Sequence, residues 1–293
     1  MTRIQAVLHA INQFLVHDGW AIASHIALSV LMSFFPFLIF ITAFAGLLGS
    51  RALADESALL FLETWPKEVA QPLAREIKAV LTSAPGDILT VGAVLSVYFA
   101  SSGVESLRIG LNRAYGRVEM RHFLIMRLES IGFVLMGALT ILAVAFLIIL
   151  GPTIVGVVRM VDPDLLLLFP NLTWLRILLA TGMLIAALVV THLWLPAGTR
   201  SLRDVWVGIV ATLAMWLAGG IGFSVYLENF SENYVRTYAG LASGMIALVF
   251  LYTAATIFLF GAEINAALME RRAAREAARA ELRAEASGGP TLT

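Results

Sequence analysis

Five ionisable side chains lie within or near the ends of long apolar stretches, where a charge is costly. They are His25, Glu105, Glu129, His192 and Glu263. A charge placed in hydrocarbon costs roughly 2.5–3.5 kcal/mol even on lenient insertion scales. Such groups therefore face one another, water or a hydrogen-bonding neighbour. Carboxylates and imidazoles in such places can bind a proton or the polar part of a substrate.

Glu263 and Asn265 are the first candidates for a substrate or proton site. They lie in a short motif of small residues, which lets a neighbouring helix approach closely. Glu105 and Ser33 are the further candidates, and all four are predicted to line a vestibule among the helices. Asn265 follows Glu263 by two residues, so on a helix the two side chains point to different flanks.

These candidates also have a purely structural interpretation. The carboxylates can extend to the interface, or pair with an adjacent arginine such as Arg108 or Arg127. Ser33 can hydrogen-bond between helices or satisfy a carbonyl that a helix proline leaves free. His192 can be bonded to neighbouring backbone. The sequence leaves both interpretations open.

Arg113, Arg117 and Arg121 recur every four residues in a short connection. If that connection is helical, they form one basic edge that binds anionic lipid headgroups, each worth about 1 kcal/mol. The alternative is that they only fix orientation in the membrane. Gly116 can break such a helix.

The sequence contains no motif that indicates a metal site or a nucleotide-binding site. There is no cysteine, no glycine-rich phosphate loop and no carboxylate cluster. The histidines lack the short spacings of metal motifs: His9, His17, His25, His122 and His192. We therefore expect no cofactor, no metal, no nucleic-acid partner and no enzymatic activity.

The elements that position these residues are predicted to be membrane-spanning helices. Of the 293 residues 59% are hydrophobic and only 14% charged, and the apolar residues form long blocks. Each block has about 20 residues or more, enough to cross a bilayer as a helix. The sequence thus predicts an all-α polytopic membrane protein with six transmembrane helices, at about 25–49, 88–107, 128–150, 174–195, 205–227 and 241–269.

Three further segments flank or interrupt this bundle of residues 25–269. Residues 1–24 are predicted to form an amphipathic helix in the membrane interface. A periplasmic surface helix is expected within residues 51–87. Residues 270–293 are predicted to form a charged tail, disordered at its end. Gly222 and Gly244 are expected to allow close helix packing.

Orientation follows from the positive charges. Most of the 20 arginines and lysines fall in segments on the same side as the N-terminus. Because such residues accumulate on the cytoplasmic side, both chain ends are predicted to be cytoplasmic, in a bacterial inner membrane.

Several motifs together are similar to one known family. They are a serine-bearing run ending in Phe35-Pro36, Tyr98-Phe-Ala-Ser-Ser-Gly103, Leu111-Asn-Arg-Ala-Tyr115, Leu195-Pro196, and Gly261-Ala-Glu-Ile-Asn265. In this order they resemble the YihY/BrkB family of bacterial inner-membrane proteins, once labelled ribonuclease BN. The resemblance implies six spans, a cytoplasmic C-terminus, and transport or export as the usual hypothesis.

The functional prediction is a transporter or exporter of a lipid or amphipathic solute. The alternative is a non-transporting membrane scaffold, and an RNA-processing enzyme ranks last. Anionic headgroups on the cytoplasmic side are the expected partners. The oligomeric state stays open, with a homo-oligomer among the options.

Overall fold

The structure is a computed structural model that describes residues 3–47, 87–145, 147, 172–238 and 241–286. Most of these residues are helical, short connections such as 115–122 and 195–201 join the helices, and the described ranges contain no strand. The seven α-helices are α1 (Arg3–Val16), α2 (Gly19–Leu47), α5 (Asp87–Ala114), α6 (Phe123–Ala145), α9 (Leu172–Trp194), α10 (Leu202–Tyr238) and α11 (Ala242–Ala286). The expected surface helix and the last seven residues of the tail lie outside this description.

Four of these helices are long and apolar enough to cross a membrane. The qualifying segments are Phe123–Ile141, Trp174–Trp194, Leu202–Asn229 and Gly244–Arg283. A fifth is added if the bent pair Gln5–Val16 and Gly19–Ser33 counts as one span. Within the described part of the chain α5 is not among them, so the count of six stays a prediction.

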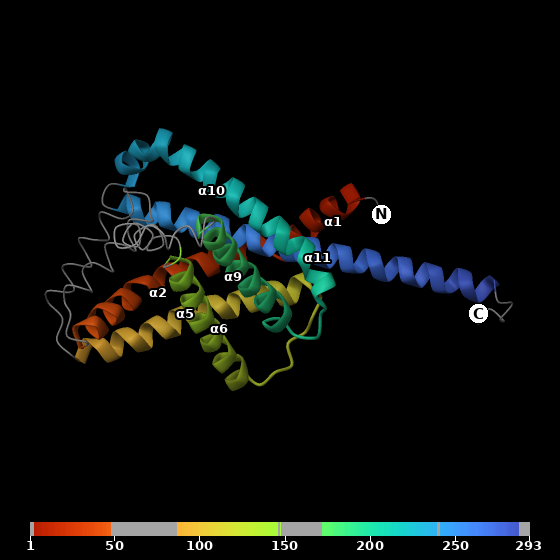
Figure 1. Cartoon of the computed structure of the whole chain (residues 1–293), viewed down its shortest axis with the longest axis horizontal. Coiled ribbons are helices and arrows are strands. Elements are labelled where there is room, and N and C mark those ends of the chain that lie inside the picture. Colours follow the sequence, from red (N-terminus) through yellow and green to blue (C-terminus); the bar gives the residue numbers. More distant parts are fainter. Residues whose placement is uncertain (1–2, 48–86, 146, 148–171, 239–240, 287–293) are drawn as a thin grey trace.

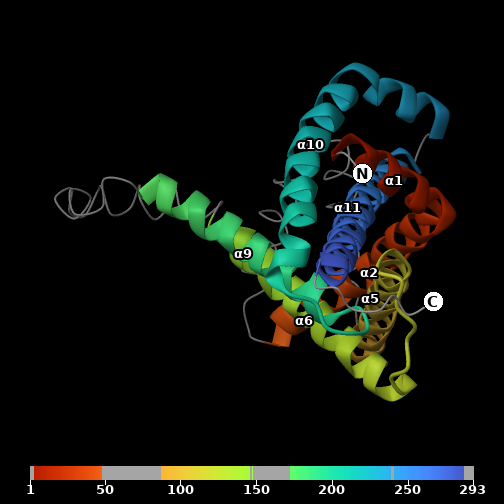
Figure 2. The same ribbon diagram turned by 90° about the vertical axis from the view of Figure 1, so that its right-hand side faces the viewer.

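Helix α11 lies at the centre of the bundle. It packs against α10 on one side and against α2 and α5 on the other, as Figure 2 shows. The α2–α5 pair has the most extensive contact, and α6 joins α5 to α9. Buried core side chains include Phe14, Leu111, Leu195, Val205 and Phe258, and the partly buried Phe133 of α6 packs against this cluster.

Helices α10 and α11 approach most closely at two glycines. A Cβ on Gly208 would overlap the Gly261 carbonyl oxygen and the Asn265 side chain, and one on Gly261 would overlap Thr212. By contrast, Gly222 and Gly244 have no described heavy atom within 4 Å of a Cβ position. Among the described residues the close contact therefore forms at Gly208 and Gly261 and not at these two glycines.

The amphipathic segment is divided by an elbow. We expected helix up to residue 24, but α1 ends at Val16 and α2 begins at Gly19, with a bend of 65° between them. Asp18 is left-handed, with φ 56°, which ends α1. Gly19 then lies under the Phe14 ring, where a Cβ would overlap the ring.

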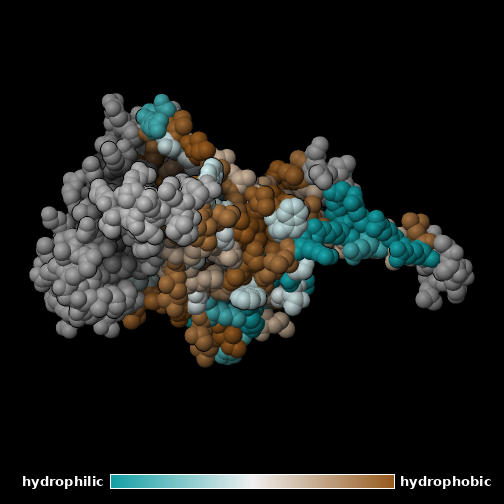
Figure 3. Space-filling view, viewed as in Figure 1, coloured by the Kyte–Doolittle hydropathy of each residue, from teal (hydrophilic) through white to brown (hydrophobic). Residues whose placement is uncertain are grey.

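The surface separates an apolar body from a charged extension (Figure 3). Large apolar side chains are exposed on α6, α9 and α10, as expected for helices in contact with lipid. The last part of α11 extends beyond the bundle, with exposed arginines and glutamates (Figure 1). Residues 270–286 thus form a solvated helix continuous with the last span.

Candidate functional site

The candidate site lies where α5 ends, α6 begins and the 195–201 segment joins α9 to α10. Helix α5 ends in a Schellman motif. Gly116 is left-handed with φ 58°, Arg117 N donates to Asn112 O at 2.8 Å, and Gly116 N donates to Arg113 O at 3.1 Å. On the other side, Ser201 begins α10, and its N–H and hydroxyl both donate to Asp204. These ends hold the intervening segments against α11.

A chain of buried polar groups crosses this junction. Gly208 N donates to Asn265 Oδ1 at 2.6 Å, and Asn265 Nδ2 donates to the Tyr115 hydroxyl at 3.4 Å. Tyr115 Oη lies 2.9 Å from His192 Nδ1. Burial raises the pKa of the Tyr115 hydroxyl, which therefore keeps its proton.

Two buried polar atoms beside this chain have no hydrogen-bond partner among the described residues. They are His192 Nε2 and Thr212 Oγ1, both on fully buried residues. The His192 ring stacks on Phe258, with 4.9 Å between centroids, and Thr212 lies against Gly261. An unsatisfied buried polar group costs about 1–3 kcal/mol, so its retention calls for an explanation.

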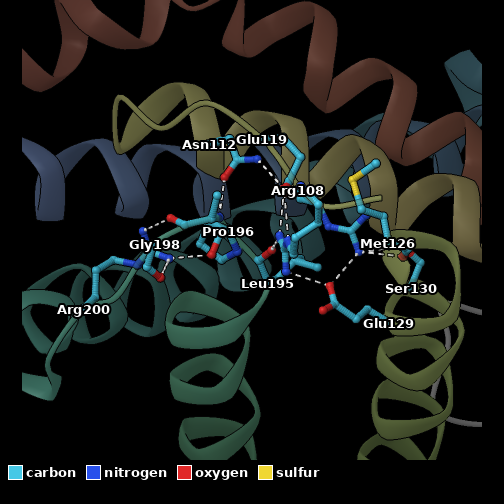
Figure 4. Close-up of polar contacts among 12 residues, drawn as sticks. Arg108, Asn112, Glu119, Met126, Glu129, Ser130, Leu195, Pro196, Gly198 and Arg200 are labelled. Atoms are coloured by element: carbon cyan, nitrogen blue, oxygen red, sulfur yellow. Dashed lines mark hydrogen bonds and ion pairs between the residues drawn. The ribbon is translucent and has the colours of Figure 1, made fainter. Parts of the chain in front are cut away.

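A network of arginines and glutamates closes the same end of the bundle (Figure 4). Arg121 binds Glu119 and Glu129, each at 2.7 Å, and donates to Leu195 O at 2.8 Å. The hydrogen bonds from Arg121 lower the pKa of Glu119 to about 2. Arg108 is buried and donates to Ser130 Oγ and to a backbone carbonyl, both at 2.9 Å. The network joins α5, α6 and α9.

Asn112 and Arg200 attach the 195–201 segment to α5. Asn112 Oδ1 accepts from Ala197 N at 2.7 Å, and its amide donates to Glu119 at 3.1 Å. Arg200 donates to the backbone carbonyls of His192, Pro196 and Ala197 and lies over the Tyr115 ring, 4.7 Å from its centroid. Among the described residues it has no carboxylate within 4 Å, so backbone dipoles rather than an ion pair compensate its charge.

Glu263 belongs to a separate contact, between α11 and α1. It is 4% exposed, and its Oε1 lies 2.7 Å from His17 Nδ1 at the elbow. Two α-helical turns further on, Glu270 lies 3.0 Å from His9 Nε2. Arg113 fixes the elbow from α5, donating to His17 O at 3.1 Å and to Asp18 at 3.0 Å. Two histidine–glutamate pairs therefore hold the N-terminal helix on α11.

The four predicted site residues are not brought together. Glu263 and Asn265 point to different flanks, to α1 and α10, as their spacing predicts. Glu105 pairs with Arg127 on α6 at 2.9 Å, which is the structural interpretation offered above. Ser33 donates to Val30 O within its own helix. The expected shared vestibule is therefore replaced by separate contacts, because each side chain has a nearer partner.

The three arginines do not form one basic edge either. Helix α5 ends at Ala114, so the chain from Gly116 to Met120 is not helical. Arg113 turns to the elbow, and Arg121 turns to Glu119 and Glu129. The remaining arginine, Arg117, lies against Gly198.

Sequence reasoning missed several residues that form the junction. Asn112 and Tyr115 were present in the family-like motif but were not interpreted, and His192 was assigned to backbone contacts. Arg108 was considered only as an ion-pair partner of a carboxylate, and Arg200 only as one of the charges that set the orientation. Tyr115 contacts His192 and Asn265, which are 77 and 150 positions away in the chain. A single sequence carries no signal of such a contact.

Buried polar groups among long apolar helices define a polytopic α-helical membrane protein. Comparison with protein families identifies the group: the model described as virulence factor BrkB matches residues 10–286, and the chain belongs to this family. The resemblance seen in the motifs is thereby confirmed.

Two curated proteins are similar over most of this chain. The ribonuclease-like protein YfkH of Bacillus subtilis is 28% identical over 266 residues, which is 89% of this chain and 94% of YfkH. A UPF0761 membrane protein of Rhodospirillum centenum is 26% identical over 274 residues, or 93% of this chain; the chain spans 59% of that relative. No solved structure matches.

Proposed function

We propose that this membrane protein transports a lipid or an amphipathic solute, and that the buried polar chain from Gly208 to His192 belongs to its pathway. The observation that carries the proposal is the pair of unsatisfied buried atoms, His192 Nε2 and Thr212 Oγ1. Polar groups within membrane helices are expensive and mark substrate or proton pathways.

The proposal includes the topology. Six spans, with both chain ends in the cytoplasm of a bacterial inner membrane, are supported by the arginines at one end of the bundle. Arg108, Arg121 and Arg200 lie there, where α5 and α9 end and α6 and α10 begin. Helix α5 serves as one of the six spans in this scheme, with Glu105 compensated by Arg127.

A substitution at Thr212 tests whether the buried polar chain takes part in transport. Thr212→Val removes an unsatisfied hydroxyl without changing the shape of the side chain. We expect the variant to be slightly more stable, since the desolvated hydroxyl is lost, and to transport more slowly. Thr253→Val is the matched control, because the Thr253 hydroxyl is satisfied by Val249 O in its own helix.

The measurement is leaflet exchange of fluorescent phosphatidylglycerol in vesicles that contain the purified chain, with empty vesicles as the blank. The wild type and Thr253→Val should exchange the probe, and Thr212→Val should do so several-fold more slowly. A wild-type rate equal to that of empty vesicles would contradict lipid transport. A Thr212→Val variant as fast as the wild type would remove the polar chain from the pathway.

The second candidate is a membrane scaffold, which is favoured by one observation. Helix α11 continues through residues 270–286 as an exposed charged helix, a surface suited to partner proteins. If transport fails, truncation after Met269 should abolish the cellular phenotype of the gene while membrane insertion persists.

We further propose that the chain is not an enzyme. The five histidines have separate partners: His9 contacts Glu270, His17 contacts Glu263, His25 contacts Ser106, His122 accepts from Leu124 N, and His192 contacts Tyr115. Purified protein with magnesium, manganese or zinc should leave precursor tRNA intact. Cleavage that is lost in one histidine variant would overturn this proposal.

A further inference from the structure

Arg117 differs from the other arginines at its end of the bundle. Arg113 and Arg121 are both bound to carboxylates, whereas the exposed Arg117 guanidinium has no hydrogen-bond or ion-pair partner among the described residues. Its atoms lie against Gly198, with Nε 3.4 Å from where a Cβ would stand. Gly198 is left-handed, with φ 85°, so glycine suits this turn. The next residue, Thr199, is exposed and also has no partner in the described part of the chain.

Positive charge is in excess around this turn. The guanidinium groups of Arg108, Arg117, Arg121 and Arg200 gather here. Glu105 and Asp204 also act on them but are paired with Arg127 and Arg272. Within 4 Å, the described carboxylates that oppose these arginines are Glu119 and Glu129. Both carboxylates are already bound by Arg121. Arg200 is surrounded by carbonyls instead, and the charges of Arg117 and Arg121 lower its pKa further after desolvation. An anion beside Arg117 would relieve this repulsion.

The side chains around Arg117 have the exposure pattern that is typical of a membrane surface. In the extended segment after it, Glu119 and Arg121 turn inward, while Val118 and Met120 are 78% and 89% exposed. Exposed apolar side chains that alternate with buried ion pairs are the pattern expected where a segment meets lipid. Trp194, 70% exposed, and Trp206, 56% exposed, flank the 195–201 segment, as in the aromatic belts of membrane interfaces.

We propose that Arg117, together with the Gly198–Thr199 turn, binds the phosphate of an anionic phospholipid headgroup, with Val118 and Met120 against the acyl chains. The guanidinium supplies a planar fork that matches two phosphate oxygens, and the Thr199 hydroxyl supplies a further donor. The exposed apolar pair selects a lipid over a soluble phosphate. The site does not depend on transport, because a scaffold would bind the lipid in the same way.

The test is native mass spectrometry of the detergent-purified full chain titrated with phosphatidylglycerol, with phosphatidylcholine as the zwitterionic comparison. Arg117→Gln should weaken phosphatidylglycerol binding by about tenfold, the loss of one charge-assisted contact. Arg117→Lys keeps the positive charge but loses the planar fork of the guanidinium. Its affinity for phosphatidylglycerol should lie between those of the wild type and Arg117→Gln. The matched control is Arg203→Gln, which removes an exposed arginine three residues beyond Arg200 at the same end.

Each outcome decides the proposal. Weaker phosphatidylglycerol binding in Arg117→Gln, with the binding of Arg203→Gln unchanged, supports the proposed site. If lipid binding were weakened equally in both variants, the attraction would be nonspecific. If lipid binding were unchanged in Arg117→Gln, Arg117 would not belong to the site. Either result overturns the proposal. Inorganic phosphate that displaces the lipid at equal concentration would assign the site to a soluble anion. Because this assay measures binding alone, its failure is distinct from failure of leaflet exchange.

Discussion

At the scale of single residues, the two polar members of the last span serve different neighbours. Glu263 fixes the N-terminal helix through His17, and Asn265 fixes α10 through the backbone of Gly208. A buried carboxylate beside an imidazole is stabilised by hydrogen bonding as well as by charge. Substitutions at Glu263 separate these contributions.

Glu263→Gln should retain most of the stability, because the amide oxygen can still accept from His17. Glu263→Ala should lose about 1–3 kcal/mol, since the partner is left without an acceptor. Unfolding in matched detergent measures both. The more exposed pair provides the control: Glu270→Ala should cost no more than about 1 kcal/mol. Equal stability of the alanine and glutamine variants of Glu263 would show that the contact with His17 contributes little.

The same two variants report on function. If the charge of Glu263 is needed for transport, both should slow leaflet exchange similarly at matched protein level. If the residue only packs, the alanine variant should be much the slower. Wild-type rates in both would remove Glu263 from the pathway.

Glu119 gives the protein an acid-sensitive contact. Its pKa is lowered to about 2 in the folded protein, against roughly 4.3 in an unfolded chain. A depressed carboxylate stabilises the fold fully above the unfolded value, and this stability is lost as the pH falls toward the folded value. The stability difference between wild type and Glu119→Gln should thus be constant above about pH 5 and shrink between about pH 4 and pH 2. A difference that does not change over that range would contradict the assignment.

At the scale of helices, the α10–α11 contact depends on the absence of two side chains. Gly208→Ala should force the helices apart at Gly261 and strain the bond from Gly208 N to Asn265, at a cost of about 1–3 kcal/mol or more. Gly222→Ala, on the same helix, meets no described atom within 4 Å and should be neutral or slightly stabilising. Thermal unfolding of the two variants in one detergent provides the comparison. Similar midpoints would contradict the close contact.

The elbow between α1 and α2 could not be predicted from the spacing of apolar residues. The apolar spacing of residues 3–24 is helical on both sides of the elbow, so periodicity alone gave no break. The break depends on a left-handed Asp18 and on Gly19 fitting under Phe14, and neither is a periodic feature.

At the scale of the whole molecule, the helical class and most helix positions could be predicted from the sequence. Long apolar blocks have one stable form in a membrane, because a helix satisfies its own backbone hydrogen bonds. Neighbour relations could not be predicted in this way. Gly208 and Gly222 look alike in sequence, and only the packing decides which one meets α11. The sequence also predicted that the four candidate site residues line one vestibule. It did not show that Glu105 pairs with Arg127 or that Ser33 bonds within its own helix.

The proposed topology makes a simple prediction. A reporter that is active only in the cytoplasm should work when fused after Glu285 and when inserted near Arg117. A fusion near Glu68 should report the opposite side. A cytoplasmic signal from Glu68 would overturn both the charge-based orientation and the six-span scheme.

Helix α11 has a mechanical consequence. It runs from Ala242 to Ala286 without interruption, and no glycine or proline lies between Ala262 and its end. At 1.5 Å per residue, these 45 residues make a rod about 68 Å long. A sideways force on its solvated end acts as on a lever, with the Gly208 contact as the pivot. A partner that binds the exposed end of this helix would therefore exert a torque on Asn265 and Glu263 inside the bundle.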